Sequence, residues 1–307
     1  MDFSMIDRRL ALALPVASLA ALGGCGGSST SEVLFPSEPF TGFDDVENLT
    51  RYTLEGEARS IRLSQQDDGT FDVETGDTTP DQDASLEFAQ NSSGDVAFVD
   101  IAANGANLKL DELEGDDFDD DGNRVEAEGE IESDREGDAA EFSTDDDYEY
   151  QTFGFWTLGD PVATAAVGSF GLETSSAAVA ARTGEAEYSG DALGGYIDDD
   201  GNGFSVTASV DLDVNFDDDD FTMNTSDTRI TPAGGSASSA APQLDLAGSG
   251  SIVGRLLDGV LSTSGLAGDV TGRFYGDEDD AAEDGGGTWD VGGSAGRYIG
   301  AFGARED

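Results

Sequence analysis

The glycine-punctuated stretch from Gly272 to Gly303 constrains the possible fold of this chain more than any other segment. Glycine clusters there separate three short pieces of apolar or aromatic sequence, Arg273 to Tyr275, Thr288 to Val291 and Tyr298 to Phe302. Glycine serves where strands bend sharply or where two backbones approach closely, because it has no Cβ. The spacing therefore predicts consecutive hairpins of the kind that close a β-barrel.

The clearest single strand lies upstream, between Val206 and Phe216. Apolar residues occupy every second position there, so one face of the strand is apolar and the other is polar. Such a strand fits a barrel filled with side chains or a barrel whose apolar face meets lipid. Aromatic residues make up 8% of the chain, too few for the girdles of a membrane barrel, and this favours the filled, soluble barrel.

The composition favours an all-β fold. Forty-two glycines occur among 307 residues, and glycine-rich sequence propagates helices poorly. Residues 32–182 show short strand patterns, such as Arg51 to Leu63 and Asp95 to Ala102, with turn residues between them. We therefore expect a smaller β-rich region there, followed at residues 183–307 by an eight-stranded antiparallel soluble β-barrel, for which about eight strand candidates suffice.

The most aromatic segment runs from Tyr148 to Thr157. It has two interpretations, an exposed aromatic platform for a ligand or a buried strand that joins the two regions. Aromatic side chains dominate core contacts, so the buried strand is the favoured interpretation.

The first 24 residues have the pattern of a signal peptide, with Arg8 and Arg9 before the apolar run Leu10 to Leu22. This run is too short to span a membrane. The sequence that ends at Cys25 resembles a bacterial lipobox, in which the cysteine carries acyl chains such as palmitate. Cys25 is the only cysteine, so it has no disulfide partner within the chain, and lipidation accounts for the thiol. The alternative is an ordinary signal peptide beside a free thiol.

Residues 25–31 are expected to form a flexible Gly/Ser tether between the lipid and the folded body. Gly26 follows the cysteine, where an aspartate would retain a lipoprotein at the inner membrane. We therefore expect the lipid on Cys25 to anchor the protein in the outer membrane, on its cell-surface or periplasmic face.

The charge of the chain excludes several functions. The formal net charge is −52, and an acidic field of that size repels phosphate backbones, so no nucleic-acid partner is expected. The chain has no histidine, which removes the usual ligand of transition metals and the usual general base. The acidic surface suits an environment rich in salt, and a basic protein partner is the alternative explanation.

One acidic interval has the D-x-D-x-D-G-x5-E spacing of a calcium-binding loop, with the candidate ligands Asp117, Asp119, Asp121 and Glu128. Alternating carboxylates before a glycine turn can wrap a calcium ion in oxygen atoms. However, Arg124 stands where an apolar residue normally fixes such a loop, and neither flank has a helical pattern. A solvated acidic loop is the favoured interpretation, and calcium is the only cofactor under consideration.

No catalytic pattern stands out in the sequence. It shows no nucleophile elbow, and without histidine it has no Ser-His-Asp set. The glycines Gly248, Gly250 and Gly254 have the wrong spacing for a dinucleotide loop, and no helical pattern follows them. The protein is therefore not expected to be an enzyme.

The closing segment also resembles a known family. The matching residues are Gly272, Phe274, Tyr275, Gly276, Ala281, Glu283, Gly286, Gly287, Trp289 and Gly300 to Ala304. In this order they resemble the closing hairpins of the β-barrel domain of transferrin-binding protein B and its lipoprotein relatives. Asp277 replaces a proline that is usual in the family, and Asp284 stands where the family often has an apolar residue.

The resemblance implies a barrel preceded by a handle-like region, in an outer-membrane lipoprotein that binds a ligand without catalysis. The ligand class is a solute or a metal- or haem-carrying protein, the ligand-binding residues are unknown, and the protein is expected to be monomeric. The alternative function is a structural or adhesive surface lipoprotein with a calcium-binding acidic loop.

Overall fold

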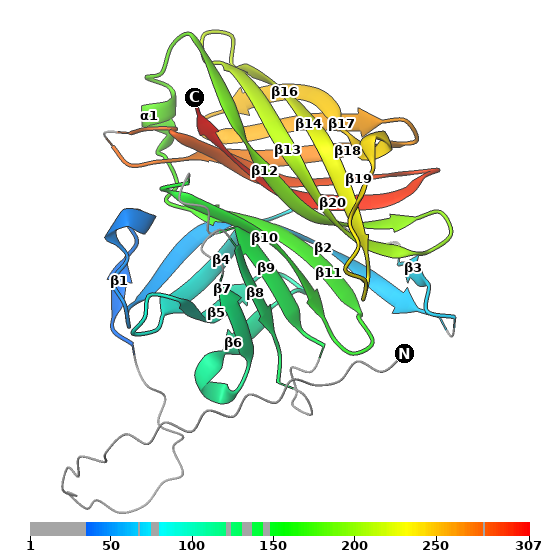
Figure 1. The fold of residues 1–307 in the computed structure, drawn as a ribbon. Helices are drawn as coiled ribbons and strands as arrows, with labels where there is room; N and C mark the ends of the chain where they lie inside the picture. Colours follow the sequence, from blue (N-terminus) through cyan, green and yellow to red (C-terminus); the bar gives the residue numbers. More distant parts are fainter. Residues whose placement is uncertain are drawn as a thin grey trace, which may run out of the picture. The chain divides into compact units, whose positions relative to one another are not determined.

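A computed structural model describes residues 35–66, 68–74, 80–120, 124–130, 137–143, 148–278 and 280–307. Cys25, the predicted signal peptide and tether, and Asp121 lie outside these ranges. Phe35–Asp307 forms one compact unit, built almost entirely of strands in two sheets (Figure 1). The all-β prediction is therefore confirmed. No helix among the described residues is long and apolar enough to cross a membrane.

The first sheet is curled and contains the strands from Ser37 to Gly171 (Figure 1). Its order is β6-β5-β4-β2-β11-β10-β9-β8-β7, and the short strands β1 and β3 pair with β2. The bounds are β1 (Ser37–Pro39), β2 (Arg51–Gln65), β3 (Phe71–Val73), β4 (Asp81–Gln90), β5 (Val96–Ala102), β6 (Leu108–Asp111), β7 (Asp117–Asp120), β8 (Arg124–Glu128), β9 (Ala139–Ser143), β10 (Gln151–Leu158) and β11 (Thr164–Gly171).

The buried carboxylate of Asp116 links the two edges of this sheet. It accepts hydrogen bonds at 2.8 Å from the backbone N–H of Asp111, at the end of β6, and of Glu130, just after β8. The short 3-10 helix η2 (Glu112–Glu114) lies between β6 and β7, so the two edge strands are also close in sequence.

The second sheet is a closed barrel. Neighbouring strands are antiparallel, β12 pairs with β20, and the pairing of β13 with β14 completes the ring of eight strands. The bounds are β12 (Glu185–Asp198), β13 (Gly203–Asn215), β14 (Asp220–Pro232), β16 (Ala247–Val253), β17 (Leu256–Thr263), β18 (Leu266–Tyr275), β19 (Asp284–Gly293) and β20 (Gly296–Glu306), with the two-residue β15 (Ser239–Ala240) on β14. The predicted eight-stranded barrel and its closing hairpins are confirmed.

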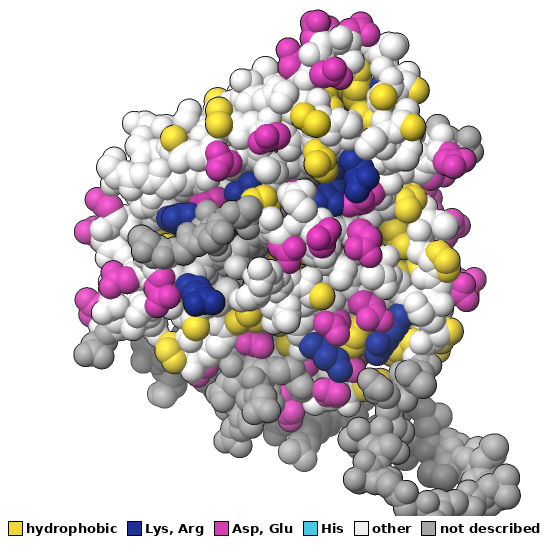
Figure 2. Space-filling view, turned by 180° about the vertical axis from the view of Figure 1, so that it is seen from behind, with side chains coloured by type: hydrophobic (Ala, Val, Ile, Leu, Met, Phe, Trp, Pro, Cys, Tyr) yellow, Lys and Arg dark blue, Asp and Glu magenta, His cyan; other side chains and the backbone are white. Residues whose placement is uncertain are grey.

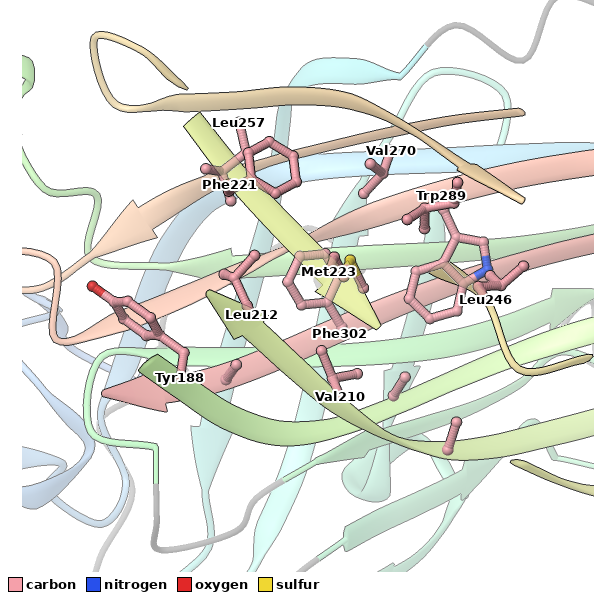
Figure 3. Packing of buried hydrophobic residues seen from close by; sticks show 14 of the residues in the cluster. Tyr188, Val210, Leu212, Phe221, Met223, Leu246, Leu257, Val270, Trp289 and Phe302 are labelled. Atoms are coloured by element: carbon pink, nitrogen blue, oxygen red, sulfur yellow. The ribbon is translucent and has the colours of Figure 1, made fainter. Parts of the chain in front are cut away.

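Apolar side chains fill the barrel (Figure 3). Val210, Leu212, Met223, Trp289 and Phe302 are at most 1% exposed and belong to one cluster. The rings of Trp289 and Phe302 stack with their centroids 6.1 Å apart. The apolar face of the strand that begins near Val206 therefore points inward, as the alternation predicts.

Two apolar segments of the barrel sequence do not form continuous strands. The segment Leu244 to Leu246 is not a strand, because the 3-10 helix η3 (Pro242–Leu244) covers its start, although both leucines are buried against the barrel core. The segment Ser251 to Leu257 is broken by a hairpin turn at Gly254, whose φ of 68° suits glycine. In the first segment apolar residues are buried without a strand, whereas in the second Val253 and Leu256 are exposed beside the turn.

The helical elements are short, as expected. They are α1 (Ser176–Val179) and the 3-10 helices η1 (Phe43–Asp45), η2 and η3. Between the sheets lies a third apolar cluster, in which Phe153 and Val167 of the first sheet pack with Leu193 and Ile299 of the barrel. Phe153 and Trp156 are at most 1% exposed, so the aromatic segment Tyr148 to Thr157 contains a buried strand and not a ligand platform.

Candidate functional site

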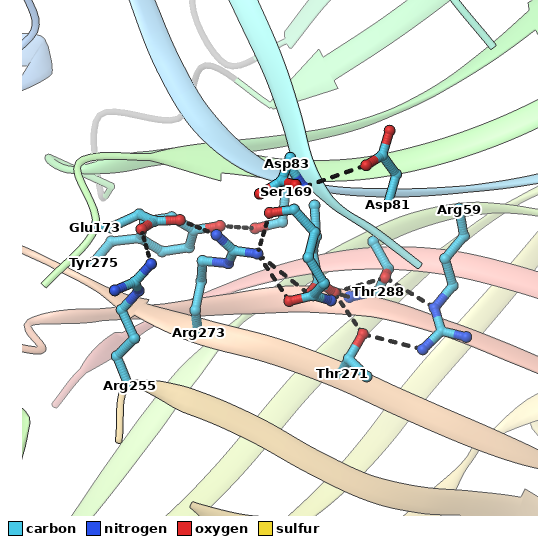
Figure 4. Close-up of polar contacts among 12 residues, drawn as sticks. Arg59, Asp81, Asp83, Ser169, Glu173, Arg255, Thr271, Arg273, Tyr275 and Thr288 are labelled. Atoms are coloured by element: carbon cyan, nitrogen blue, oxygen red, sulfur yellow. Dashed lines mark hydrogen bonds and ion pairs between the residues drawn. The ribbon is translucent and has the colours of Figure 1, made fainter. Parts of the chain in front are cut away.

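A buried polar network joins the first sheet to the barrel (Figure 4). Glu57 and Arg59 come from β2, and both are at most 4% exposed. Glu57 Oε1 accepts hydrogen bonds from the amide and hydroxyl of Thr288 at 3.0 and 2.7 Å, and from the Thr271 hydroxyl at 2.8 Å. Arg59 donates to the same two hydroxyl oxygens at 3.1 and 3.0 Å. Two barrel threonines thus bridge opposite charges of the sheet.

Arg273 of β18 extends the network across the barrel (Figure 4). Its Nη2 lies 3.9 Å from Glu57 Oε2 and donates to the Gln82 side chain at 3.0 Å. Its Nη1 donates to Glu173, whose other carboxylate oxygen lies 2.6 Å from Arg255 Nη2. Hydrogen bonds are directional, so these contacts fix the sheet on the barrel more strictly than apolar packing alone does.

A second set of polar contacts ties the start of β10 to the last barrel strands. Asp284 Oδ2 accepts from the Tyr150 amide at 2.8 Å, and the Gln151 side-chain amide donates to the Gly285 carbonyl at 3.0 Å. Asp284 is fully buried. Burial raises the pKa of Asp284 to about 7, although the hydrogen bond from Tyr150 lowers it.

Beside these contacts lies a cleft of about 520 Å³ between the sheet and the barrel. The sheet contributes Arg124, Glu126, Ser143 and Phe153, and the barrel contributes Asp191, Ala192, Leu193, Thr207, Ala208, Ser209, Asp227 and Arg229. We call this the junction cleft. Phe153 and Leu193 are buried, whereas the charged residues are at least partly exposed, so an apolar floor lies beneath a charged rim.

A β-bulge shapes the barrel wall of the junction cleft. Thr207 pairs with Arg229 and Ser209 pairs with Ser226, so two residues of β14 stand opposite Ala208 alone. Asp227 has a φ of 51°, a left-handed conformation that aspartate tolerates better than most residues. The bulge shifts the strand alternation, and both Asp227 and Arg229 consequently point outward, along the rim.

The rim is unusual for this chain because basic residues are scarce. The chain has 14 lysine and arginine residues and 66 acidic residues, and two of the arginines line the junction cleft. On the face of the molecule in Figure 2, acidic side chains are scattered and basic ones gather in a few places.

The residues of the predicted calcium loop lie mainly on a hairpin. Asp117 of β7 pairs with Glu128 of β8, and Asp119 pairs with Glu126. Asp121, the remaining predicted ligand, is outside the described residues. Within the described part of the chain, no group of three or more acidic side chains is placed to hold a metal ion. The calcium site stays a prediction.

Sequence reasoning missed the network and the junction cleft. Glu57 and Thr288 are 231 positions apart, and nothing local to either residue indicates the contact. The bulge, in contrast, leaves a signal. Inward-facing apolar residues occupy odd positions at Phe221 and Met223 but an even position at Ile230, and such a change of phase within one strand indicates an extra residue.

No protein-family model matches the chain, and no curated protein matches it. The solved structures similar to it include the isotype 1 transferrin-binding protein B of serogroup B Neisseria meningitidis, at 20% identity and a TM-score of 0.44. That match covers 81% of this chain but 43% of the neisserial protein, so this chain spans less than half of that length. The neisserial protein is a transferrin-binding protein B, and the closing hairpins of this chain resemble that family in sequence.

Two further structures are similar. A surface lipoprotein has 10% identity and a TM-score of 0.43, with 82% of this chain and 98% of that chain covered. HpuA from Kingella denitrificans, solved in complex with human haemoglobin, has 15% identity and a TM-score of 0.38, with 84% and 87% covered. At such identities and TM-scores, the likeness carries no conclusion about a ligand.

Proposed function

We propose that this chain is a non-catalytic, lipid-anchored binding protein of the outer membrane that holds a protein partner at the junction cleft. The observation that carries the proposal is the cleft itself, with its charged rim set by a bulge and its walls fixed by a buried network. Cys25 carries the lipid in this proposal, and the segment up to residue 31 is the tether.

The filled barrel supports binding on the outside. A ligand inside the barrel would have to displace Met223, Trp289 and Phe302, which are fully or almost fully buried. Expelling packed apolar side chains costs several kcal/mol, so the interior is a core and not a binding site. The junction cleft offers polar and charged groups without that cost.

The rigid junction supports the same proposal. The two walls belong to the two sheets, and the network around Glu57 joins these sheets through β2, β18 and β19. Walls that are fixed before binding lose little conformational entropy when a partner arrives. The sequence resemblance to transferrin-binding protein B extends the proposal to iron- or haem-carrying proteins as partners.

A blocking variant tests the proposal. Thr207→Trp adds a large uncharged side chain at the cleft, on an outward-facing position of β13. Ser249→Trp is the matched control, because Ser249 is exposed on β16 and does not line the cleft. Calorimetric titration of the purified full chain with human transferrin and haemoglobin would compare them with the parent.

We expect one of these proteins to bind the parent and the Ser249→Trp variant, and to bind Thr207→Trp at least about tenfold more weakly. Equal binding by Thr207→Trp would place the partner elsewhere, and absence of binding to the parent would remove the proposed partner class.

For the anchor, the membrane-extracted Cys25→Ser variant should lack the mass of the acyl chains, and an acylated mass would contradict lipidation at this residue.

A further inference from the structure

The sheet wall of the junction cleft has two carboxylates, Glu126 and Glu141, near one arginine, Arg124. Glu126 and Glu141 are direct partners across β8 and β9, and like charges placed opposite each other destabilise a sheet. Arg124 forms an ion pair with Glu141. Burial raises the pKa of Glu141, Arg124 opposes the shift, and Glu126 adds to it. The side-chain carboxylate of Glu126 makes no hydrogen bond or ion pair with any residue that the structure describes.

The barrel wall has the same imbalance. Arg229 donates from Nε to the Ser238 hydroxyl at 3.0 Å and from Nη2 to the Ser238 carbonyl at 3.4 Å. Its hydrogen bonds are therefore directed to the loop after β14 and not to Asp227. The carboxylate of Asp227, which the bulge turns toward the cleft, has no hydrogen bond or ion pair within the described ranges. Each wall thus presents one carboxylate that lacks a counter-charge.

The floor of the junction cleft limits the kind of cation that fits. Phe153 and Leu193 are apolar and buried beneath the rim. A lysine or arginine side chain has a flexible apolar stem that can enter a cleft without polar groups at its floor, while its charged head stays at the polar edge. A bare metal ion would need a cage of oxygen ligands, and among the described residues no group of three acidic side chains provides one.

We propose that the junction cleft receives a lysine or arginine side chain from a protein partner, with its charged head between Glu126 and Asp227. This inference rests on the proposed function and adds the chemistry of the partner. The net charge of −52 attracts basic segments over a longer range, and the two carboxylates determine where such a segment settles.

The test uses short Gly/Ser peptides that carry lysines, glutamates or neither, and measures their binding to the purified full chain by fluorescence anisotropy. The double variant Glu126→Gln, Asp227→Asn removes the two rim carboxylates. The matched control, Asp220→Asn with Asp258→Asn, removes two exposed carboxylates of the barrel that do not line the cleft. Both variants lose the same charge, so they differ only in its position.

We expect the lysine peptide to bind the rim variant at least about tenfold more weakly than the parent, and to bind the control variant within about twofold of the parent. Equal losses in both variants would mean attraction to the acidic surface in general and would overturn the inference. A competition with free spermine is the second check. If spermine displaces the lysine peptide at a similar concentration of positive charge, the inference is overturned, because the cleft would then bind small cations without a peptide.

A third outcome separates this inference from the proposed function. If the glutamate peptide binds better than the lysine peptide and Thr207→Trp abolishes that binding, the cleft is a binding site but the proposed partner chemistry is wrong. If no peptide distinguishes Thr207→Trp from Ser249→Trp but transferrin or haemoglobin does, the cleft is a binding site and this inference fails alone. If neither the peptides nor these proteins distinguish the two variants, both proposals fail.

Discussion

The barrel interior and the sheet–barrel junction are both buried, yet they are built from opposite chemistry. Trp289 and Phe302 pack with other apolar side chains inside the barrel, whereas Glu57, Arg59 and Arg273 meet at the junction. Apolar burial stabilises without specifying direction. A buried ionic network contributes less net stability but fixes geometry, and it is costly to interrupt. The interior therefore maintains the fold, and the junction sets the walls of the cleft.

The largest expected effect comes from placing a charge in the barrel interior. Phe302→Asp removes a ring that stacks on Trp289 and buries an unpaired carboxylate, which costs several kcal/mol or more. We expect the variant to lose its cooperative thermal transition by circular dichroism, while Phe302→Leu keeps it. A variant that melts like the parent would show that the interior is not the core of the fold.

A smaller but still large effect is expected at the junction. Glu57→Ala leaves Arg59 and Arg273 buried without their shared carboxylate, a kind of change that costs about 3–5 kcal/mol. Glu55→Ala is the matched control, since Glu55 is exposed on the same strand. Urea unfolding would measure both. A loss below about 1 kcal/mol for Glu57→Ala would mean that the network does not hold the two sheets together.

The third prediction concerns pH. The pKa of Asp284 is raised from 3.8 to about 7, so the folded protein retains a proton that the unfolded chain releases between these values. The free energy of unfolding should therefore fall as the pH rises through this window, by on the order of a few kcal/mol from this group. Asp284→Asn should reduce that slope. An identical slope in parent and variant would assign the pH dependence to other carboxylates.

The smallest effect is expected for an exposed ion pair. Lys109 Nζ lies 3.9 Å from Glu114 Oε1, and both side chains are more than two-fifths exposed. Water screens such a pair, so Lys109→Gln should change the free energy of unfolding by less than about 1 kcal/mol. A change as large as that of Glu57→Ala would remove the distinction between buried and exposed charges on which the comparison depends.

The barrel was predictable because its signals are local. Alternation from Val206 and the glycine spacing after Gly272 report on one strand or one hairpin at a time. Asp284 was visible as a departure from the family pattern, and the structure shows that it is a buried contact to Tyr150. Its role was not visible, because the partner lies 134 positions away.

The junction could not be predicted for the same physical reason. The contacts of Arg59 depend on the register of β2 against a barrel that closes more than 200 positions later. Register across a sheet is set by the whole hydrophobic pattern and by turn geometry, and no single residue encodes it. The phase change in β14 was the one local sign of the cleft.

The most direct test of the account asks where a partner touches the protein. Cys25 is the only cysteine and is proposed to be lipidated, so Ser209→Cys gives one reactive thiol at the junction cleft. Ser249→Cys gives one at the exposed control position on β16, which does not line the cleft. Each thiol would carry a photo-crosslinker, with the lysine peptide or the bound partner protein as the target. We expect crosslinks from Ser209→Cys and not from Ser249→Cys. Crosslinks from Ser249→Cys alone would contradict it.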